Sequence, residues 1–250
     1  MGQRQRNWLH LFQNNPQASM RLFCFPHAGG AASFFRMWHQ WLPDSIEVCP
    51  IQLPGRWERI HEPAFRSLEA LMEAMTNPLQ DYMDKPFALF GHSLGALIAY
   101  ELVRKIQKVS DGLRLIHLFI SSRRAPHVPA PQPYLHLLPD DQLLTSLSGR
   151  SADHKAGGRQ NLHMQKAFLS VIRNDYEMGE TYTYSPGPLL SIPLTVFGGL
   201  QDPRLSIEQL QAWQAYTDKS FSIQMFEGKH FYIQNLEKEV IKVIAEKLSR

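Results

Sequence analysis

The sequence contains few cysteines and no long run of apolar residues. Only Cys24 and Cys49 occur among 250 residues, both within short apolar segments, and no Cys-x-x-Cys pair is present. We therefore expect two buried thiols in a reducing compartment, and neither a disulfide framework nor a metal site. No apolar stretch approaches the roughly 18 residues that span a membrane, and no signal peptide is recognisable at the N-terminus. These absences predict a cytoplasmic protein that is not inserted in a membrane.

An excess of one charge sign is also absent. The chain has 26 Lys and Arg residues against 23 Asp and Glu, a net charge of +3, and its positive residues are scattered. Nucleic acid is therefore not an expected partner. Hydrophobic residues make up 44% of the chain, which is typical of a globular protein. At this length we expect one domain spanning residues 1–250.

Short apolar runs alternate with helical patterns along the chain. Because the runs are almost continuously apolar, they predict strands that helices cover on both faces, as in a parallel sheet. The six candidate strands are Arg21–Phe25, Ile46–Ile51, Pro86–Phe90, Leu115–Ser121, Leu194–Phe197 and Phe221–Phe226. Helical spacing predicts helices at Leu94–Gln107, Ile207–Tyr216 and Leu236–Leu248. This alternation favours the α/β class, with an open, mostly parallel sheet flanked by helices.

Residues from about 123 to 192 interrupt this alternation. They contain a Pro-rich segment and then two amphipathic helical patterns, without a convincing strand. The first pattern begins near Asp140, a candidate N-cap, and the second covers Gln160–Tyr176, with Gly157 and Gly158 between them. An ordinary helical excursion would give the same pattern. We expect a helical lid insertion, because long insertions between strands are often functional.

The strongest local signal is a Gly-x-Ser-x-Gly motif, Gly91-His92-Ser93-Leu94-Gly95, between an apolar strand and an amphipathic helix. This context predicts a nucleophile elbow, a tight turn that strains the serine backbone and raises its hydroxyl above the sheet edge. Gly91 and Gly95 are required because a Cβ at either position would clash. The alternative is a glycine-rich turn whose serine only caps the helix.

A serine nucleophile needs a base, and the base needs an orienting acid. In chains with this elbow the order is Ser, then Asp or Glu, then His. Of the six histidines after Ser93, His230 directly follows the last candidate strand, where catalytic groups lie in open α/β sheets. Asp202 follows the preceding strand, although the Asp-Pro pair with Pro203 is also a common turn signal. Position and order together predict Ser93 as nucleophile, His230 as base and Asp202 as acid.

The first candidate strand ends in Phe25-Pro26-His27-Ala28-Gly29-Gly30. This loop is similar to the one that supplies an oxyanion-hole N–H in lipases and esterases. We expect the backbone N–H groups of Ala28 and Leu94 to be the two donors. A phosphate cradle is the rival interpretation, but neither G-x-G-x-x-G nor G-x-x-x-x-G-K-[ST] occurs. No metal-binding spacing occurs either, so the sequence predicts neither a metal nor a cofactor.

These motifs resemble those of type II thioesterases, stand-alone enzymes of the α/β-hydrolase fold that are associated with nonribosomal peptide and polyketide synthases. The resemblance covers nearly the whole chain and rests on RLFCFPHAGGAASFFRMW, LPGRWER, DKPFALFGHSLGALIAYEL, VFGGLQDP and FEGKHFYI. Ser93, Asp202 and His230 match the family's triad, and Ala28 and Leu94 match its oxyanion positions. The segment FLSVIRNDYEMGETY departs from the family's Leu-Pro-x-Leu-Arg-Ala-Asp stretch.

The resemblance implies a serine hydrolase that releases acyl groups from the phosphopantetheine arm of acyl- or peptidyl-carrier proteins. It would remove misprimed or stalled small acyl groups from a synthase that makes, for example, an antibiotic or a siderophore. The arm arrives on the partner, so the chain itself needs no cofactor. We expect a monomer, because no exposed apolar seam is evident.

Other functions fit parts of the same pattern. A general carboxylesterase or lipase-like hydrolase would share the chemistry and differ in leaving group. The animal medium-chain acyl carrier protein thioesterase of fatty acid synthesis is a similar relative. A non-catalytic binding module would lack a triad residue or an elbow glycine, and none is missing. A terminal synthase domain would follow a carrier or linker segment, which is not seen before Arg21.

Overall fold

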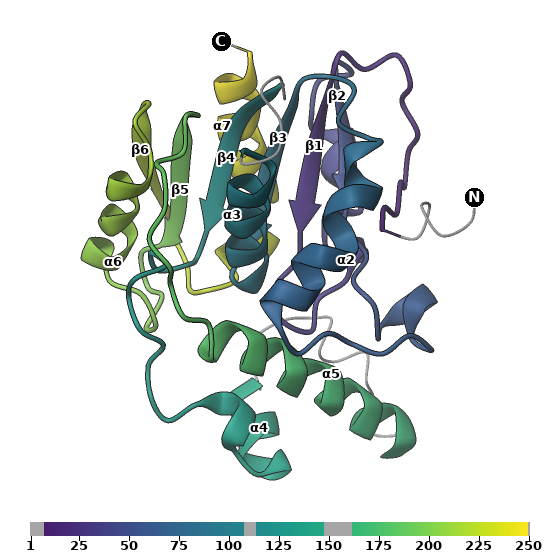
Figure 1. Cartoon of the computed structure of the whole chain (residues 1–250), viewed down its shortest axis with the longest axis vertical. Helices are drawn as coiled ribbons and strands as arrows, with labels where there is room; N and C mark the ends of the chain where they lie inside the picture. Colours follow the sequence, from purple (N-terminus) through teal and green to yellow (C-terminus); the bar gives the residue numbers. More distant parts are fainter. Residues whose placement is uncertain (1–7, 108–113, 148–161, 250) are drawn as a thin grey trace.

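A six-stranded parallel sheet forms the centre of the molecule (Figure 1). The computed structural model describes residues 8–107, 114–147 and 162–249. Within them the strand order is β2-β1-β3-β4-β5-β6, and every neighbouring pair is parallel. The strands are β1 (Met20–Phe25), β2 (Ile46–Pro50), β3 (Phe87–His92), β4 (Leu115–Ser121), β5 (Leu194–Gly199) and β6 (Phe221–Phe226). Each coincides with a predicted strand to within two residues at either end.

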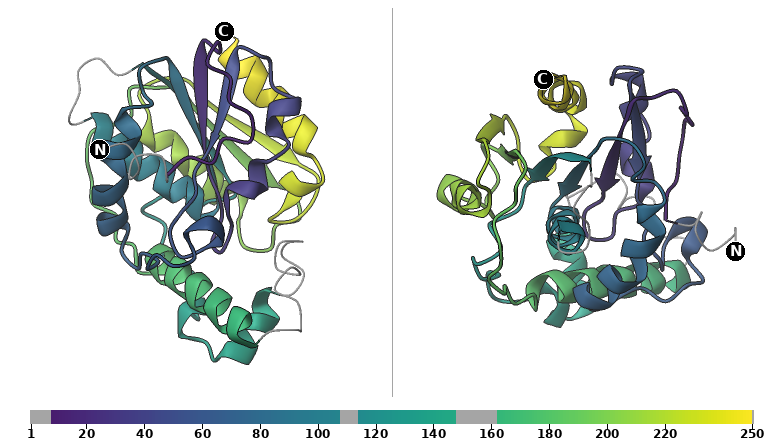
Figure 2. Two further views of the ribbon diagram at one scale, coloured as in Figure 1. Left: turned by 90° about the vertical axis from the view of Figure 1, so that its right-hand side faces the viewer. Right: turned by 45° about the horizontal axis from the view of Figure 1, so that its top comes forward.

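Helices cover both faces of this sheet (Figure 2). The helices α2 (Leu68–Gln80) and α3 (Leu94–Gln107) pack on one face in a shared apolar cluster. On the other face, α7 (Glu237–Leu248) packs with the short turns η1 (Ala32–Phe35) and η2 (Trp38–Gln40). Because both faces are covered, β2, β3 and β5 are buried along their whole length. This burial accounts for their continuous apolar sequences.

The helix predictions were correct for α3 and nearly correct for α7, which begins one residue later than expected. The predicted helix Ile207–Tyr216 is a short α-helix, α6 (Ile207–Gln211), followed by the 3-10 turn η6 (Ala212–Tyr216). The helix α2 was not predicted. Its N-cap is Ser67, whose hydroxyl accepts the N–H of Ala70, and its apolar residues recur at helical spacing on the buried side.

The segment between β4 and β5 lies at the carboxyl ends of the strands (Figure 1). Its described part contains η4 (Leu135–Leu137), α4 (Asp140–Leu147) and α5 (Leu162–Glu180), and no strand. Asp140 is the first residue of α4 and not its N-cap, because the Leu143 N–H donates one turn back to the C=O of Pro139. The predicted second helix continues four residues further, to Glu180. Gly157 and Gly158 lie outside the described residues, and a lid role stays a prediction.

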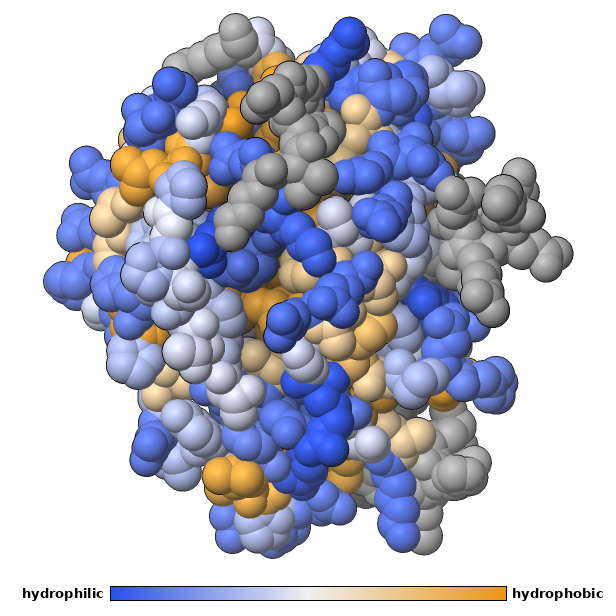
Figure 3. Space-filling model, in the orientation of Figure 1, coloured by the Kyte–Doolittle hydropathy of each residue, from blue (hydrophilic) through white to orange (hydrophobic). Residues whose placement is uncertain are grey.

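The face of the molecule shown in Figure 3 is mostly hydrophilic, and its apolar residues form separate small groups. Among the described residues, no helix is both long enough and apolar enough to cross a membrane. The helices α4 and α5 share a small apolar cluster of their own, formed by Leu143, Leu147, Leu169 and Ile172. This cluster joins the two helices into one unit beside the sheet edge.

Candidate active site

The turn between β3 and α3 has the tight geometry that its glycines predicted. Ser93 has a φ of 57°, in the left-handed region that non-glycine residues rarely adopt. A Cβ at Gly91 would lie 2.2 Å from the carbonyl oxygen of Gly95, and a Cβ at Gly95 would lie 2.1 Å from that of Phe25. The N–H of Ser93 donates to Ser121 in β4 at 2.8 Å, which holds the strained turn against the sheet.

Replacing Gly95 by Ala is expected to destabilise the fold. The new Cβ would overlap backbone atoms of β1, which cannot rotate away, so we expect a loss of about 3 kcal/mol or more in the free energy of unfolding. Gly179→Ala is the matched control, because its Cβ would meet only movable side-chain ends, Cδ1 of Leu94 at 3.3 Å and Nη1 of Arg123 at 3.5 Å. Urea denaturation measures both variants. A loss below about 1 kcal/mol for Gly95→Ala would contradict the tight turn.

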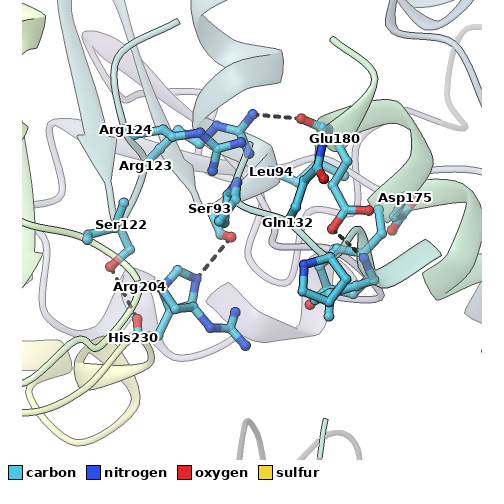
Figure 4. A pocket seen from close by; sticks show the side chains of 17 residues that line it. Ser93, Leu94, Ser122, Arg123, Arg124, Gln132, Asp175, Glu180, Arg204 and His230 are labelled. Atoms are coloured by element: carbon cyan, nitrogen blue, oxygen red, sulfur yellow. Dashed lines mark hydrogen bonds between the residues drawn. The ribbon is translucent and has the colours of Figure 1, made fainter. Parts of the chain in front are cut away.

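The structure brings the three predicted triad residues together in one hydrogen-bonded line. Figure 4 shows the part of this line that joins Ser93 to His230. His230 Nε2 lies 3.0 Å from Ser93 Oγ, and His230 Nδ1 lies 2.7 Å from Asp202 Oδ2. The second oxygen of Asp202 accepts the N–H of Arg204 at 3.0 Å, and Ser122 Oγ donates to the carbonyl of His230. Since Nδ1 faces a carboxylate, it carries the proton, and Nε2 is left to accept one from Ser93.

A cavity of about 230 Å³ opens beside Ser93 and His230. Ala28, after β1, and Leu94, the first residue of α3, both line it, as expected for the two oxyanion donors. Another wall comes from the segment between β4 and β5, including Asp175 and Gly179 of α5. The space next to the serine is therefore enclosed in part by this insertion.

Two arginines in the cavity wall were not predicted. Figure 4 shows Arg123 and Arg124 on one side of Ser93 and His230 on the other. Arg123 Nη2 donates to the carbonyl of Gly179 at 3.1 Å. Burial, together with the positive charge of Arg124, lowers the pKa of Arg123 to about 9. Both arginines and Gly179 also line a second cavity of about 310 Å³, so they lie between the two spaces.

A buried histidine lies against the predicted base. His92 is fully buried, its ring centre is 5.4 Å from that of His230, and its Nδ1 shares a hydrogen bond with Ser121. Ser121 in turn is bonded to Tyr232. Burial, and then the charges of His230 and His27, lower the pKa of His92 well below its ordinary value. A neutral His92 imposes no charge repulsion on an imidazolium at His230.

Arg56 and Asp175 form a second unpredicted pair, buried beside the cavity. Arg56 stands in LPGRWER, which supports the family resemblance, and Asp175 stands in FLSVIRNDYEMGETY, which departs from the family's pattern. Nothing in either segment indicated that the two residues meet. Among the described residues, no group of three His, Cys, Asp or Glu side chains is placed to hold a metal ion.

Comparison with known proteins identifies the family. The family profile described as "Thioesterase domain" matches residues 20–248. The chain belongs to the thioesterase family. This thioesterase is 35% identical over 243 residues to linear gramicidin dehydrogenase LgrE of Brevibacillus parabrevis, covering 96% of this chain and 92% of that protein. It is 37% identical over 234 residues to gramicidin S biosynthesis protein GrsT of Aneurinibacillus migulanus, covering 94% and 91%.

A solved structure gives the same result for the fold of this thioesterase. The type II thioesterase BorB from the borrelidin biosynthetic cluster superposes with a TM-score of 0.85 at 32% identity, covering 97% of this chain and 96% of that one. The predicted resemblance to type II thioesterases and the predicted α/β-hydrolase fold are thus confirmed. The chain is a thioester hydrolase by family. The roles expected of Ser93, Asp202, His230, Ala28 and Leu94 stay predictions.

Proposed function

We propose that this thioesterase hydrolyses acyl groups from the phosphopantetheine arm of carrier proteins, with Ser93 as nucleophile. The observation that carries the proposal is the hydrogen-bonded line from Asp202 through His230 to Ser93 beside a cavity. Similarity to GrsT and BorB over more than nine-tenths of both chains supports the carrier role, since their names assign them to gramicidin S and borrelidin biosynthesis. Its role would be to clear misprimed or stalled acyl groups from a synthase.

The geometry supports a two-step acyl transfer. Ser93 Oγ attacks the thioester carbonyl as His230 Nε2 takes its proton, and Asp202 stabilises the imidazolium that forms. The negative charge on the carbonyl oxygen is held by the N–H groups of Ala28 and Leu94. The pantetheine sulfur leaves with the proton from His230. Water, deprotonated by His230, then attacks the acyl-enzyme, and the free acid departs as Ser93 regains its proton.

The size of the cavity favours short acyl groups. Its volume of about 230 Å³ is below the range of about 300–1,000 Å³ that is common for small-molecule sites. Arg123 and Leu135 are among the residues that line it. We therefore propose short acyl groups as substrates and set aside the fatty acid synthesis alternative.

Shortening Arg123 is expected to lengthen the accepted acyl chain. Arg123→Ala would join the cavities of about 230 and 310 Å³. We expect the ratio of kcat/KM for octanoyl to that for acetyl thioesters to rise about tenfold or more, since each buried methylene contributes about 0.8 kcal/mol. Arg123→Met, which removes the charge but keeps most of the length, is expected to leave the ratio near the wild-type value. An unchanged ratio in Arg123→Ala would refute the dividing role.

The name of one relative, LgrE, indicates dehydrogenase chemistry. This chain contains no G-x-G-x-x-G loop for a nicotinamide dinucleotide, so we do not propose that chemistry for it.

We propose that the protein is a monomer. It would meet its carrier protein at the mouth of the cavity, where the segment between β4 and β5 would act as a lid.

Intact-mass spectrometry of an acetyl-loaded carrier protein tests the proposal. The carrier is incubated with the enzyme, with the Ser93→Ala variant and with buffer, and an acetyl oxygen ester is offered in parallel. Rapid loss of acetyl from the carrier with slow cleavage of the ester is expected. Cleavage of the oxygen ester alone would make the protein a general esterase and overturn the carrier role.

A further inference from the structure

A buried ion pair lies next to the loop that carries Ala28. Asp175 of α5 is 1% exposed, and Arg56, in the loop after β2, is 6% exposed. Arg56 donates a hydrogen bond from each terminal nitrogen to the carboxylate of Asp175: Nη1 lies 2.6 Å from Oδ2, and Nη2 lies 2.9 Å from Oδ1. Paired contacts of this kind fix the orientation of both groups as well as their separation.

The same pair also holds the backbone of the loop after β1. Asp175 Oδ2 accepts the N–H of Gly29 at 2.7 Å, and Arg56 Nη1 donates to the carbonyl of Gly30 at 3.2 Å. Gly29 has a φ of 75°, a conformation open to glycine, so its backbone has freedom that contacts must restrain. Since the N–H of Gly29 belongs to the peptide unit joining Ala28 to Gly29, this bond restrains the backbone of Ala28.

The loop is anchored from two directions. Gln52, after β2, accepts the N–H of Ala32 at 3.0 Å and donates to the carbonyl of Arg56 at 3.2 Å. These bonds come from the neighbouring loop of the sheet. Asp175 comes instead from α5, whose residues also wall the cavity. The position of α5 and the geometry of the Ala28 backbone are therefore linked through one carboxylate.

We propose that Asp175 is a positioning residue for the oxyanion hole, held by Arg56, and that it aligns the Ala28 N–H when α5 covers the cavity. The proposal rests on the acyl-transfer function proposed above. An amide in place of the carboxylate offers one accepting oxygen instead of two, so either the Gly29 N–H and Arg56 Nη1 or Arg56 Nη2 would face an NH2 donor, and Arg56 would keep a buried charge without its partner. The loop would then relax, and the Ala28 donor would point away from the developing charge.

Asp175→Asn tests this alignment, because asparagine keeps the shape of the side chain but loses the charge. The readout is the inhibition constant of butyl trifluoromethyl ketone, which forms a hemiketal with Ser93 and places an oxyanion in the hole. We expect this constant to rise about 10²-fold and kcat/KM to fall by a similar factor, mostly in kcat, as is typical of a displaced oxyanion donor. Arg56→Lys, which retains a charge but not the paired contact, is expected to shift both quantities in parallel.

Glu177→Gln is the matched control. Glu177 lies two positions after Asp175 on α5 and pairs with the exposed Arg66 at 2.8 Å, away from the oxyanion loop. We expect the inhibition constant of the ketone for this variant to stay within about twofold of the wild-type value, because exposed ion pairs contribute little to the stability of a local structure. Thermal unfolding of each variant confirms that the folded enzyme is compared.

The outcomes separate this proposal from the proposed function. If the Asp175→Asn variant folds but binds the ketone as tightly as wild type does, the positioning role is overturned, even if kcat falls. If Asp175→Asn does not fold, Arg56→Lys gives the same decision. Wild type that binds the ketone through Ser93 but leaves acyl-carrier proteins intact would refute the carrier role alone. Wild type that does not bind the ketone would overturn both.

Discussion

Replacement of Ser93 by Ala is expected to abolish acyl-enzyme formation and to lower kcat by about 10⁶-fold, because no other group can take over the nucleophilic attack. Ser93 is only partly buried, and its backbone conformation is as accessible to alanine as to serine, so the variant is expected to fold. Intact-mass spectrometry of the enzyme after mixing with an acyl-carrier protein would detect the covalent intermediate in wild type and not in the variant.

Ser122→Ala provides a close control for this experiment. Ser122 also lines the cavity and also has a positive φ, 50°, but its hydroxyl bonds the carbonyl of His230 and not Nε2. The variant is expected to form the acyl-enzyme. If the Ser93→Ala variant became acylated to the same extent as wild type, Ser93 would not be the nucleophile.

Replacement of Asp202 by Asn is expected to lower kcat by about 10⁴-fold without unfolding the protein. The carboxylate holds the proton on His230 Nδ1 across 2.7 Å. An amide placed there would donate its own N–H, favouring the tautomer whose Nε2 carries the proton and cannot accept one from Ser93. Steady-state kinetics on a short acyl thioester measure the effect.

The control for Asp202→Asn is Asp218→Asn, which removes an exposed carboxylate paired with Lys219. We expect its kcat to match that of wild type. If Asp202→Asn retained more than about a tenth of the wild-type rate, another carboxylate would have to orient His230.

The fold was largely predictable because its signals are local. A strand that is buried on both faces must be apolar throughout, and Phe87–His92 carries this pattern without reference to any other part of the chain. The helix α2 was missed although its signals are also local, with a Ser67 N-cap and buried Leu71, Met72 and Met75. Pro78 in its last turn weakens the helical pattern, since proline lacks an N–H and disrupts the turn before it.

The candidate site, like the fold, has parts that the sequence predicted and parts that it did not. The triad could be predicted because each member occupies a recognisable place just after a strand. The partnership of Arg56 with Asp175 could not, because the two residues are 119 positions apart and either charge alone suggests a solvated surface. Only the folded chain shows that one carboxylate bonds both Arg56 and the N–H of Gly29.

The parallel sheet also determines when activity can arise during folding. Ser93 and His230 are 137 positions apart, and Gly29 and Asp175 are 146 apart, so the site joins three strand ends and the helix α5 by contacts of very high sequence separation. Closing long loops has an entropic cost, and chains with such a high contact order fold slowly. Partly folded chains with secondary structure in place would therefore still lack the site. Only fully folded molecules are therefore expected to hydrolyse substrate. After denaturation, the hydrolytic activity would recover later than the helical signal in circular dichroism.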